Sequence, residues 1–99
     1  MAEYCLTLIC PPSVEEKLLD ALLLHVGDEL FTSSPTFSHG TPHGRLSPTE
    51  QVMGRSRSVQ VQVLLSAEEL QVLRTRLREE FAGTGLRFWA HALVMEGEF

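Results

Sequence analysis

A β-prone run that leads directly into a helix start occurs twice in this chain, and few small folds accommodate that pattern. Residues 3–10 (EYCLTLIC) are mostly apolar, and after two prolines Ser13 to Glu16 (SVEE) match a capping box. Residues 57–65 (RSVQVQVLL) alternate apolar and polar side chains, and Ser66 to Glu69 (SAEE) match a second capping box. A chain of 99 residues is the size of one domain, so we predict a single domain, 1–99, built on two β-α units.

Apolar residues at helical spacing follow both capping boxes. They predict one helix over residues 13–25 and a second that begins after Ser66 and ends near Gly83. Each helix presents an apolar stripe that needs a sheet to cover it.

Two further segments complete the set of strands. Residues 30–38 predict a weaker strand, in which Pro35 favours a sheet edge because it cannot donate to a ladder. Residues 86–95 predict a strongly apolar last strand. The order β-α-β-β-α-β predicts an α+β, ferredoxin-like fold, with a four-stranded antiparallel sheet and both helices on one face.

The face of this sheet that the helices leave bare carries large apolar side chains. Contiguous apolar patches of this kind usually mark interfaces, and glutamines can satisfy each other or a partner's backbone across one. We therefore predict a homo-oligomer, with contacts from Ile9, Gln60, Gln62, Trp89 and Leu93. The alternative is that the chain termini cover part of this face.

The segment 39–56 (HGTPHGRLSPTEQVMGRS) is long for a connection inside a small domain, and such connections are usually functional. Arg45 and Arg55, with Arg57 just beyond, stand against the single acid Glu50 in an otherwise acidic chain. These arginines favour a loop that contacts an anion or a partner. A solvated loop without a ligand is the alternative.

The same loop has few large apolar side chains with which to order itself. Ser47 to Glu50 (SPTE) predict one helical turn over residues 48–53, and we expect a bound ligand or partner to order the remainder.

Two histidines in the loop suggest a different chemistry. His39 and His43 have a spacing with which imidazoles can hold zinc or copper. They supply half of a site, which a trimer could complete. Surface histidines without a metal are the alternative.

The residues between the second helix and the last strand are Gly83, Thr84 and Gly85, with Arg87 just beyond. Glycines there allow backbone N–H groups to approach an anion, and Arg87 could clamp a phosphate. A tight turn without a ligand is the alternative.

Charge and composition exclude several classes of protein. Eight Lys+Arg against thirteen Asp+Glu leave a net charge of −5, which disfavours nucleic-acid binding. No apolar run is long enough for membrane insertion, and the first residues carry no basic leader, so we expect a cytoplasmic protein. Cys5 and Cys10 lie five apart in one strand and point to opposite faces, as two buried thiols rather than a disulfide or a chelate.

Enzymatic activity is not expected. The chain has no asparagine for an acylphosphatase site, no serine elbow and no Walker lysine. Lys17 is its single lysine, which excludes most mechanisms that proceed through a Schiff base.

Two stretches of the sequence resemble a known family. YCLTLICPPSVEEKLLDALL (4–23) and HGRLSPTEQVMGRSRSVQVQVLL (43–65) resemble a small bacterial family of the PII-like/CutA-like group, and the resemblance covers nearly the whole chain. It implies a homotrimer in which 39–56 corresponds to the T-loop, through which PII proteins touch their partners.

The resemblance also implies a function and a partner. In PII proteins nucleotides bind in clefts between subunits, at positions that here hold Arg55, Arg57 and the turn from Gly83 through Gly85 to Arg87. It implies a regulatory or sensor protein that binds a small anionic effector or a nucleotide. Relatives are often encoded beside heavy-metal efflux pumps, which implies a transporter or efflux component as partner and, as the alternative, a metal-binding role for His39 and His43. The turn departs from PII proteins because it has no lysine for phosphate.

Overall fold

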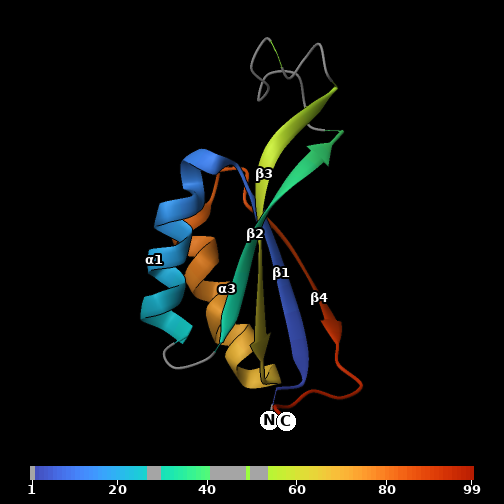
Figure 1. Ribbon diagram of the computed structural model, residues 1–99. Helices are drawn as coiled ribbons and strands as arrows, with labels where there is room; N and C mark the ends of the chain where they lie inside the picture. The colour runs from blue at the N-terminus through green and yellow to red at the C-terminus, as the bar shows by residue number, and fades with distance from the viewer. Residues whose placement is uncertain (1, 27–29, 41–48, 50–53) are drawn as a thin grey trace.

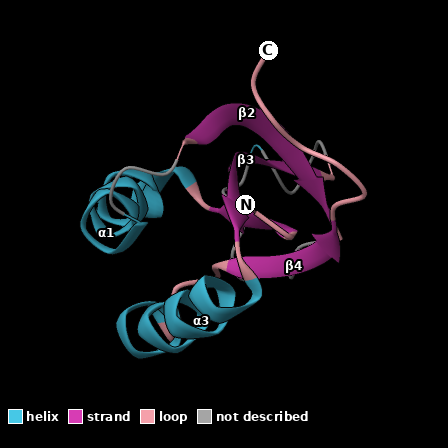
Figure 2. Ribbon diagram, turned by 90° about the horizontal axis from the view of Figure 1, so that it is seen from below, coloured by secondary structure: helices cyan, strands magenta, loops and turns pink. Residues whose placement is uncertain are grey.

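The predicted order of strands and helices is confirmed by the computed structural model, which describes residues 2–26, 30–40, 49 and 54–99 (Figure 1). In chain order its elements are β1 (Tyr4–Cys10), a 3₁₀ turn (Pro12–Val14), α1 (Glu15–Val26), β2 (Phe31–His39), β3 (Arg55–Leu65), α3 (Ala67–Phe81) and β4 (Arg87–Ala92). Both helices lie on the same side of the sheet (Figure 2), as a ferredoxin-like fold requires. Within these residues no helix is long and apolar enough to cross a membrane.

The strands form one antiparallel sheet in the order β2-β3-β1-β4. This order places the mostly apolar β1 in the interior, beside β3, and makes β2 and β4 the edges. Pro35 lies in the edge strand β2, opposite Val59, where the missing N–H leaves no gap in an interior ladder. The predicted edge position is therefore confirmed.

The pairing of β1 with β3 carries the hydrophobic core. Leu6 lies opposite Val63 and Leu8 opposite Val61, and none of these four side chains is more than 2% exposed. Against them pack one stripe from each helix, comprising Leu18, Ala21 and Leu22 of α1 and Leu73, Leu77 and Phe81 of α3. The alternation in residues 57–65 thus correctly identifies the strand face that meets the helices.

The capping box at the start of α3 is confirmed. The Ser66 N–H donates to Glu69 Oε1 at 2.9 Å, and the Glu69 N–H donates to Ser66 Oγ at 3.1 Å. The bond from the Ser66 backbone lowers the pKa of the Glu69 carboxyl, because it stabilises the ionised form. The cap therefore satisfies two groups at the helix end that otherwise lack partners.

The capping box predicted at Ser13 is wrong. Pro11 is the N-cap of the 3₁₀ turn, no side chain caps it, and the Val14 N–H donates to the Pro11 carbonyl at 3.0 Å. Because the ring of Pro12 fixes φ near the helical value, the turn begins before Ser13 can act as a cap.

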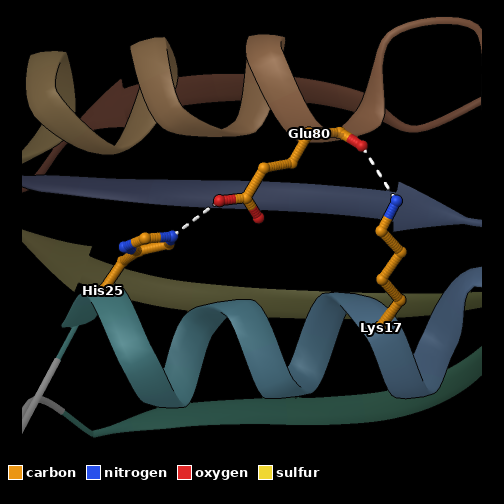
Figure 3. A network of polar contacts seen from close by, with 3 residues as sticks. All are labelled: Lys17, His25 and Glu80. Carbon is orange, nitrogen blue, oxygen red and sulfur yellow. Dashed lines mark hydrogen bonds and ion pairs between the residues drawn. The ribbon is translucent and has the colours of Figure 1, made fainter.

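Glu80 of α3 makes polar contacts with two residues of α1 (Figure 3). Its carboxylate Oε1 lies 2.9 Å from His25 Nε2, and its backbone carbonyl accepts a hydrogen bond from Lys17 Nζ at 3.0 Å. Lys17 Nζ also lies 4.9 Å from the centre of the Phe81 ring. The chain's single lysine thus donates to a backbone carbonyl in the last turn of α3, where a positive charge is favourable.

Several predicted boundaries differ from the structure. β2 continues through His39 and β3 already begins at Arg55, so the connection predicted as 39–56 is 40–54. The last strand ends at Ala92 instead of residue 95. His43, Arg45 and most of the turn predicted over 48–53 lie outside the described residues, and the predictions for them remain predictions.

The bare face of the sheet carries the predicted interface residues in cross-strand rows. In one row Trp89 and Gln62 both lie opposite Thr7, and in the next Arg87 and Gln60 both lie opposite Ile9. Gln62 Nε2 donates to Thr7 Oγ1 at 3.3 Å, so this glutamine has a partner within its own sheet.

Trp89 is 51% exposed, and every residue of β4 is exposed. Leu93, predicted as part of the last strand, follows its end and is half-buried, with its N–H donating to the Glu3 carbonyl. The sheet therefore presents an open apolar edge at β4.

Removal of the α3 cap gives a first prediction. Ser66→Ala removes one cap bond, and we expect urea unfolding at pH 7 to show a loss of about 1 kcal/mol in the free energy of unfolding. The lowered pKa of Glu69 gives a stabilisation that is present above its ordinary value of 4.5 and is lost as the pH falls through the lower folded value. Glu69→Gln should therefore flatten the decline of stability below pH 4.5.

Glu68→Gln is the matched control, because it makes the same change of charge in the same turn and leaves the cap intact. Equal flattening by the two variants would show that the cap bond is not the cause.

Candidate functional site

A groove of about 960 Å³ lies at the end of the sheet where β1 stops and β4 starts. The last pair of β1 with β3 is Cys10 with Val59, whereas β2 and β3 stay paired as far as His39 and Arg55. The β2–β3 hairpin therefore extends beyond the rest of the sheet (Figure 1). The groove lies between the base of this hairpin, the prolines after β1 and the start of β4.

The charged and titratable side chains that line the groove are two arginines, a histidine and a buried cysteine. Arg57 and His39 come from the hairpin and Arg87 from the first position of β4. No aspartate or glutamate is among its described lining residues, although the chain carries a net charge of −5. The groove is therefore a locally cationic site in an acidic protein, which suits an anion.

Hydroxyl groups and aromatic rings also contribute to its wall. The hydroxyls come from Ser13, Thr36, Ser38, Ser56 and Ser58, and the rings from Phe37, Phe88 and Trp89. Ser38 and Ser58 share a hydrogen bond at 2.6 Å between their Oγ atoms, which ties the two hairpin strands together. Hydroxyls can donate to an anion as well as accept, so the wall offers neutral donors beside the arginines.

The turn before β4 determines where Arg87 lies. Gly83 and Gly85 have φ of +79° and +89°, which side chains disfavour, and this lets the chain reverse within the few residues between α3 and β4. The Thr84 hydroxyl donates to the Phe81 carbonyl at 2.7 Å and accepts from the Leu86 N–H at 3.4 Å. The turn is thus fixed from within.

The structure brings together many of the residues predicted from sequence. His39, Arg57, Gly85 and Arg87 line the groove, and so do three of the predicted interface residues, namely Ile9, Gln60 and Trp89. Gln62 and Leu93 are not among the lining residues.

Two predicted ligand residues lie elsewhere. Arg55 stacks on the ring of Phe37, with its guanidinium carbon 4.3 Å from the ring centre. Gly83 lines a smaller pocket on the helix side of the sheet. The hydroxyl wall was not predicted from the sequence, in which the corresponding signal is the run of serines and threonines at alternate positions in 32–38 and 56–58.

The described residues give little support for a metal site. No cluster of three or more His, Cys, Asp or Glu side chains occurs among them. Burial, with a smaller contribution from Glu15, raises the pKa of the Cys10 thiol to about 11, which disfavours the thiolate that a metal requires. The predicted metal pair depends on His43, whose position is outside the described part of the chain.

Both cysteines are free and buried, at 6% exposure for Cys5 and 1% for Cys10. The prediction of two buried thiols without a disulfide is confirmed.

Comparison with protein families gives one match over the full length of the chain. The model described as "Protein of unknown function (DUF3240)" matches residues 1–99. No curated protein matches the chain.

Solved structures share the fold at low sequence identity. A DUF3240 family protein from Shewanella baltica is 15% identical with a TM-score of 0.79, covering 100% of this chain and 98% of the other. The PII-like protein CPII from Thiomonas intermedia, in a structure bound to ADP, AMP and bicarbonate, is 14% identical with a TM-score of 0.74 and coverages of 100% and 98%. CutA1 from Pyrococcus horikoshii is 11% identical with a TM-score of 0.71 and coverages of 96% and 87%. These likenesses establish the PII-like and CutA-like fold.

The cysteine environment gives a second prediction. We expect iodoacetamide at pH 8 to modify Cys10 slowly in the native protein, because its raised pKa leaves little thiolate and its side chain is buried. In 6 M guanidinium both cysteines should react at the rate of ordinary thiols. Mass spectrometry of the alkylated peptides follows each site, and fast native modification of Cys10 would contradict this description of the strand.

Proposed function

The chain belongs to the DUF3240 family, and from this premise we propose that it is a PII-like regulatory protein that binds a small anionic effector or a nucleotide in the groove. The observation that carries the proposal is the charge of the groove, where two arginines and a histidine meet with no acidic residue among the described lining. The structural neighbour CPII, which is bound to ADP, AMP and bicarbonate, supports a ligand of this class.

Each group of the groove has a role in this proposal. Arg57 and Arg87 approach from opposite walls, and guanidinium groups bind phosphate or carboxylate oxygens through paired, charge-assisted hydrogen bonds. The Gly85 backbone and the hydroxyls of Ser38 and Ser58 supply neutral donors. Trp89, on the bare face of the sheet, offers a ring face to the base of a nucleotide.

A homotrimer is part of the proposal. Ile9, Gln60 and Trp89 belong both to the bare face of the sheet and to the lining of the groove. A neighbouring subunit packed on that face would therefore also close the groove, so that ligand binding and assembly are linked. We place the contact with a partner protein on the connection 40–54, which starts at one wall of the groove.

Binding without catalysis and a cytoplasmic location complete the proposal. Lys17, which could otherwise serve in covalent chemistry, is engaged in the bridge between the helices. The two free, buried thiols fit a reducing compartment.

Metal binding is the alternative function. His39 is the last residue of β2 and lines the groove. It could therefore bind a metal together with His43, four residues further along the chain. A structural neighbour from Archaeoglobus fulgidus is described as a divalent cation tolerance protein, which supports testing zinc and copper beside the nucleotides.

Calorimetry tests the ligand class. We expect ATP, ADP or AMP to bind the wild-type protein, and Arg57→Ala and Arg87→Ala each to weaken binding by tenfold or more. The reason is that a hydrogen bond to a charged group is worth about 1.5–3 kcal/mol. Arg76→Ala is the matched control, because it removes an exposed arginine of α3 that does not line the groove.

Three results would contradict the anion proposal. These are no nucleotide binding at millimolar concentration, an equal loss of affinity in Arg76→Ala, and binding of Zn²⁺ or Cu²⁺ alone that is lost in His39→Ala. The last of these would support the metal alternative.

Light scattering tests the assembly. We expect the mass of a trimer at micromolar concentration and dissociation of Trp89→Glu, because an unpaired charge buried in an interface costs several kcal/mol. Val72→Glu is the control, since Val72 is 57% exposed on α3, close to the 51% of Trp89, but lies away from the bare face. A monomeric wild-type protein would contradict the proposal.

A further inference from the structure

A second pocket, of about 210 Å³, lies on the other side of the turn that ends the groove. It opens between α3, β1 and the start of β4, on the face of the sheet that the helices cover. Leu6 and Leu8 of β1 and Leu77 and Phe81 of α3 line it with apolar side chains. These four belong to the hydrophobic core, so the pocket is an opening in the core wall.

Two arginines stand at this apolar opening. Arg74 and Arg78 are one helical turn apart on α3, and both line the pocket, where no described acidic residue joins them. Arg74 has a long contact of 3.5 Å with Gln71 Oε1, and Arg78 has no hydrogen-bond or ion-pair partner among the described residues. Like charges at this spacing destabilise a helix, and none of the glutamates of α3 lines the pocket beside the two arginines.

Placement near the carbonyl end of α3 accounts for a positive charge at Arg78. It does not account for a second arginine one turn earlier, nor for a pocket with an apolar lining beside the pair. An occupant with an apolar body and one negative group would satisfy all three features.

We propose that this pocket binds a small amphipathic carboxylate, with its apolar chain against Leu8, Leu77 and Phe81 and its carboxylate between Arg74 and Arg78. The volume supports a small ligand, because it is far above the roughly 15 Å³ that one water needs and below the roughly 300 Å³ of pockets for larger ligands. The pocket is distinct from the groove. The two share Gly85 and Phe88 in their walls, but neither Arg74 nor Arg78 lines the groove.

Calorimetry with hexanoate, hexanol and acetate tests the proposal. We expect hexanoate to bind the wild-type protein more tightly than hexanol, which lacks the charge, and than acetate, which lacks the chain. Arg74→Gln with Arg78→Gln should weaken hexanoate binding by about tenfold or more, since two charge-assisted hydrogen bonds are lost. Arg76 lies two residues from both Arg74 and Arg78 on the same helix and does not line the pocket, so Arg76→Gln should leave the affinity for hexanoate unchanged.

The groove variants separate this site from the proposed function. Arg57→Ala should leave hexanoate binding unchanged, because that side chain is not in the pocket. Loss of hexanoate binding in Arg57→Ala would assign the carboxylate to the groove and overturn the proposal, as would equal affinity in Arg76→Gln and in the double variant. Absence of hexanoate binding at millimolar concentration would also overturn it, and this includes the case in which a second copy of the chain fills the pocket. Nucleotide binding in the groove is measured separately, so either proposal can fail while the other stands.

Discussion

The pairing of β1 with β3, from Tyr4 opposite Leu65 to Cys10 opposite Val59, fixes the position of most other parts of the molecule. Side chains alternate across a sheet, so this register sends Leu6, Leu8, Val61 and Val63 to the helices as one layer. The same register sends the intervening residues to the bare face. A slip of one residue would exchange the two sets and expose the core.

The groove is a consequence of the unequal lengths of these two strands. β1 ends at Cys10, where two prolines follow, whereas β3 continues four residues further from Val59 to its start at Arg55. Proline cannot extend a ladder, so the hairpin loses its neighbour at this point and one wall of a groove is left open. The turn at Gly83 and Gly85 then returns the chain to the same end of the sheet, which brings Arg87 opposite the hairpin. Residues from four distant parts of the sequence meet because one strand stops early.

Regular periodicity made the fold predictable from the sequence. The alternation in residues 57–65, the stripe of α3 and the box at Ser66 each depend on neighbours a few residues away, and all three are confirmed. The box at Ser13 failed because the preceding prolines determine the backbone before the side chain can cap it. Arg57, Gly85 and Arg87 could be proposed for the site because charged and glycine residues are conspicuous in a connection. The hydroxyl wall was not predicted, because hydroxyl side chains at alternate positions are ordinary on a solvated strand face until the hairpin register pairs Ser38 with Ser56.

The distribution of charge explains how an acidic chain can still select anions. Its acids are concentrated on the helices, for example at Glu15, Glu16, Glu68 and Glu69, while the described walls of the groove and of the helix-side pocket contain none. At physiological ionic strength charges are screened over about 8 Å, so an anion inside either site responds mainly to the arginines that touch it. At low ionic strength the net charge of −5 acts over longer distances and opposes the approach of the same anion. Affinity and approach are therefore set by different residues, and substitutions of these helix glutamates should alter association rates without altering the contacts that determine which anion is bound.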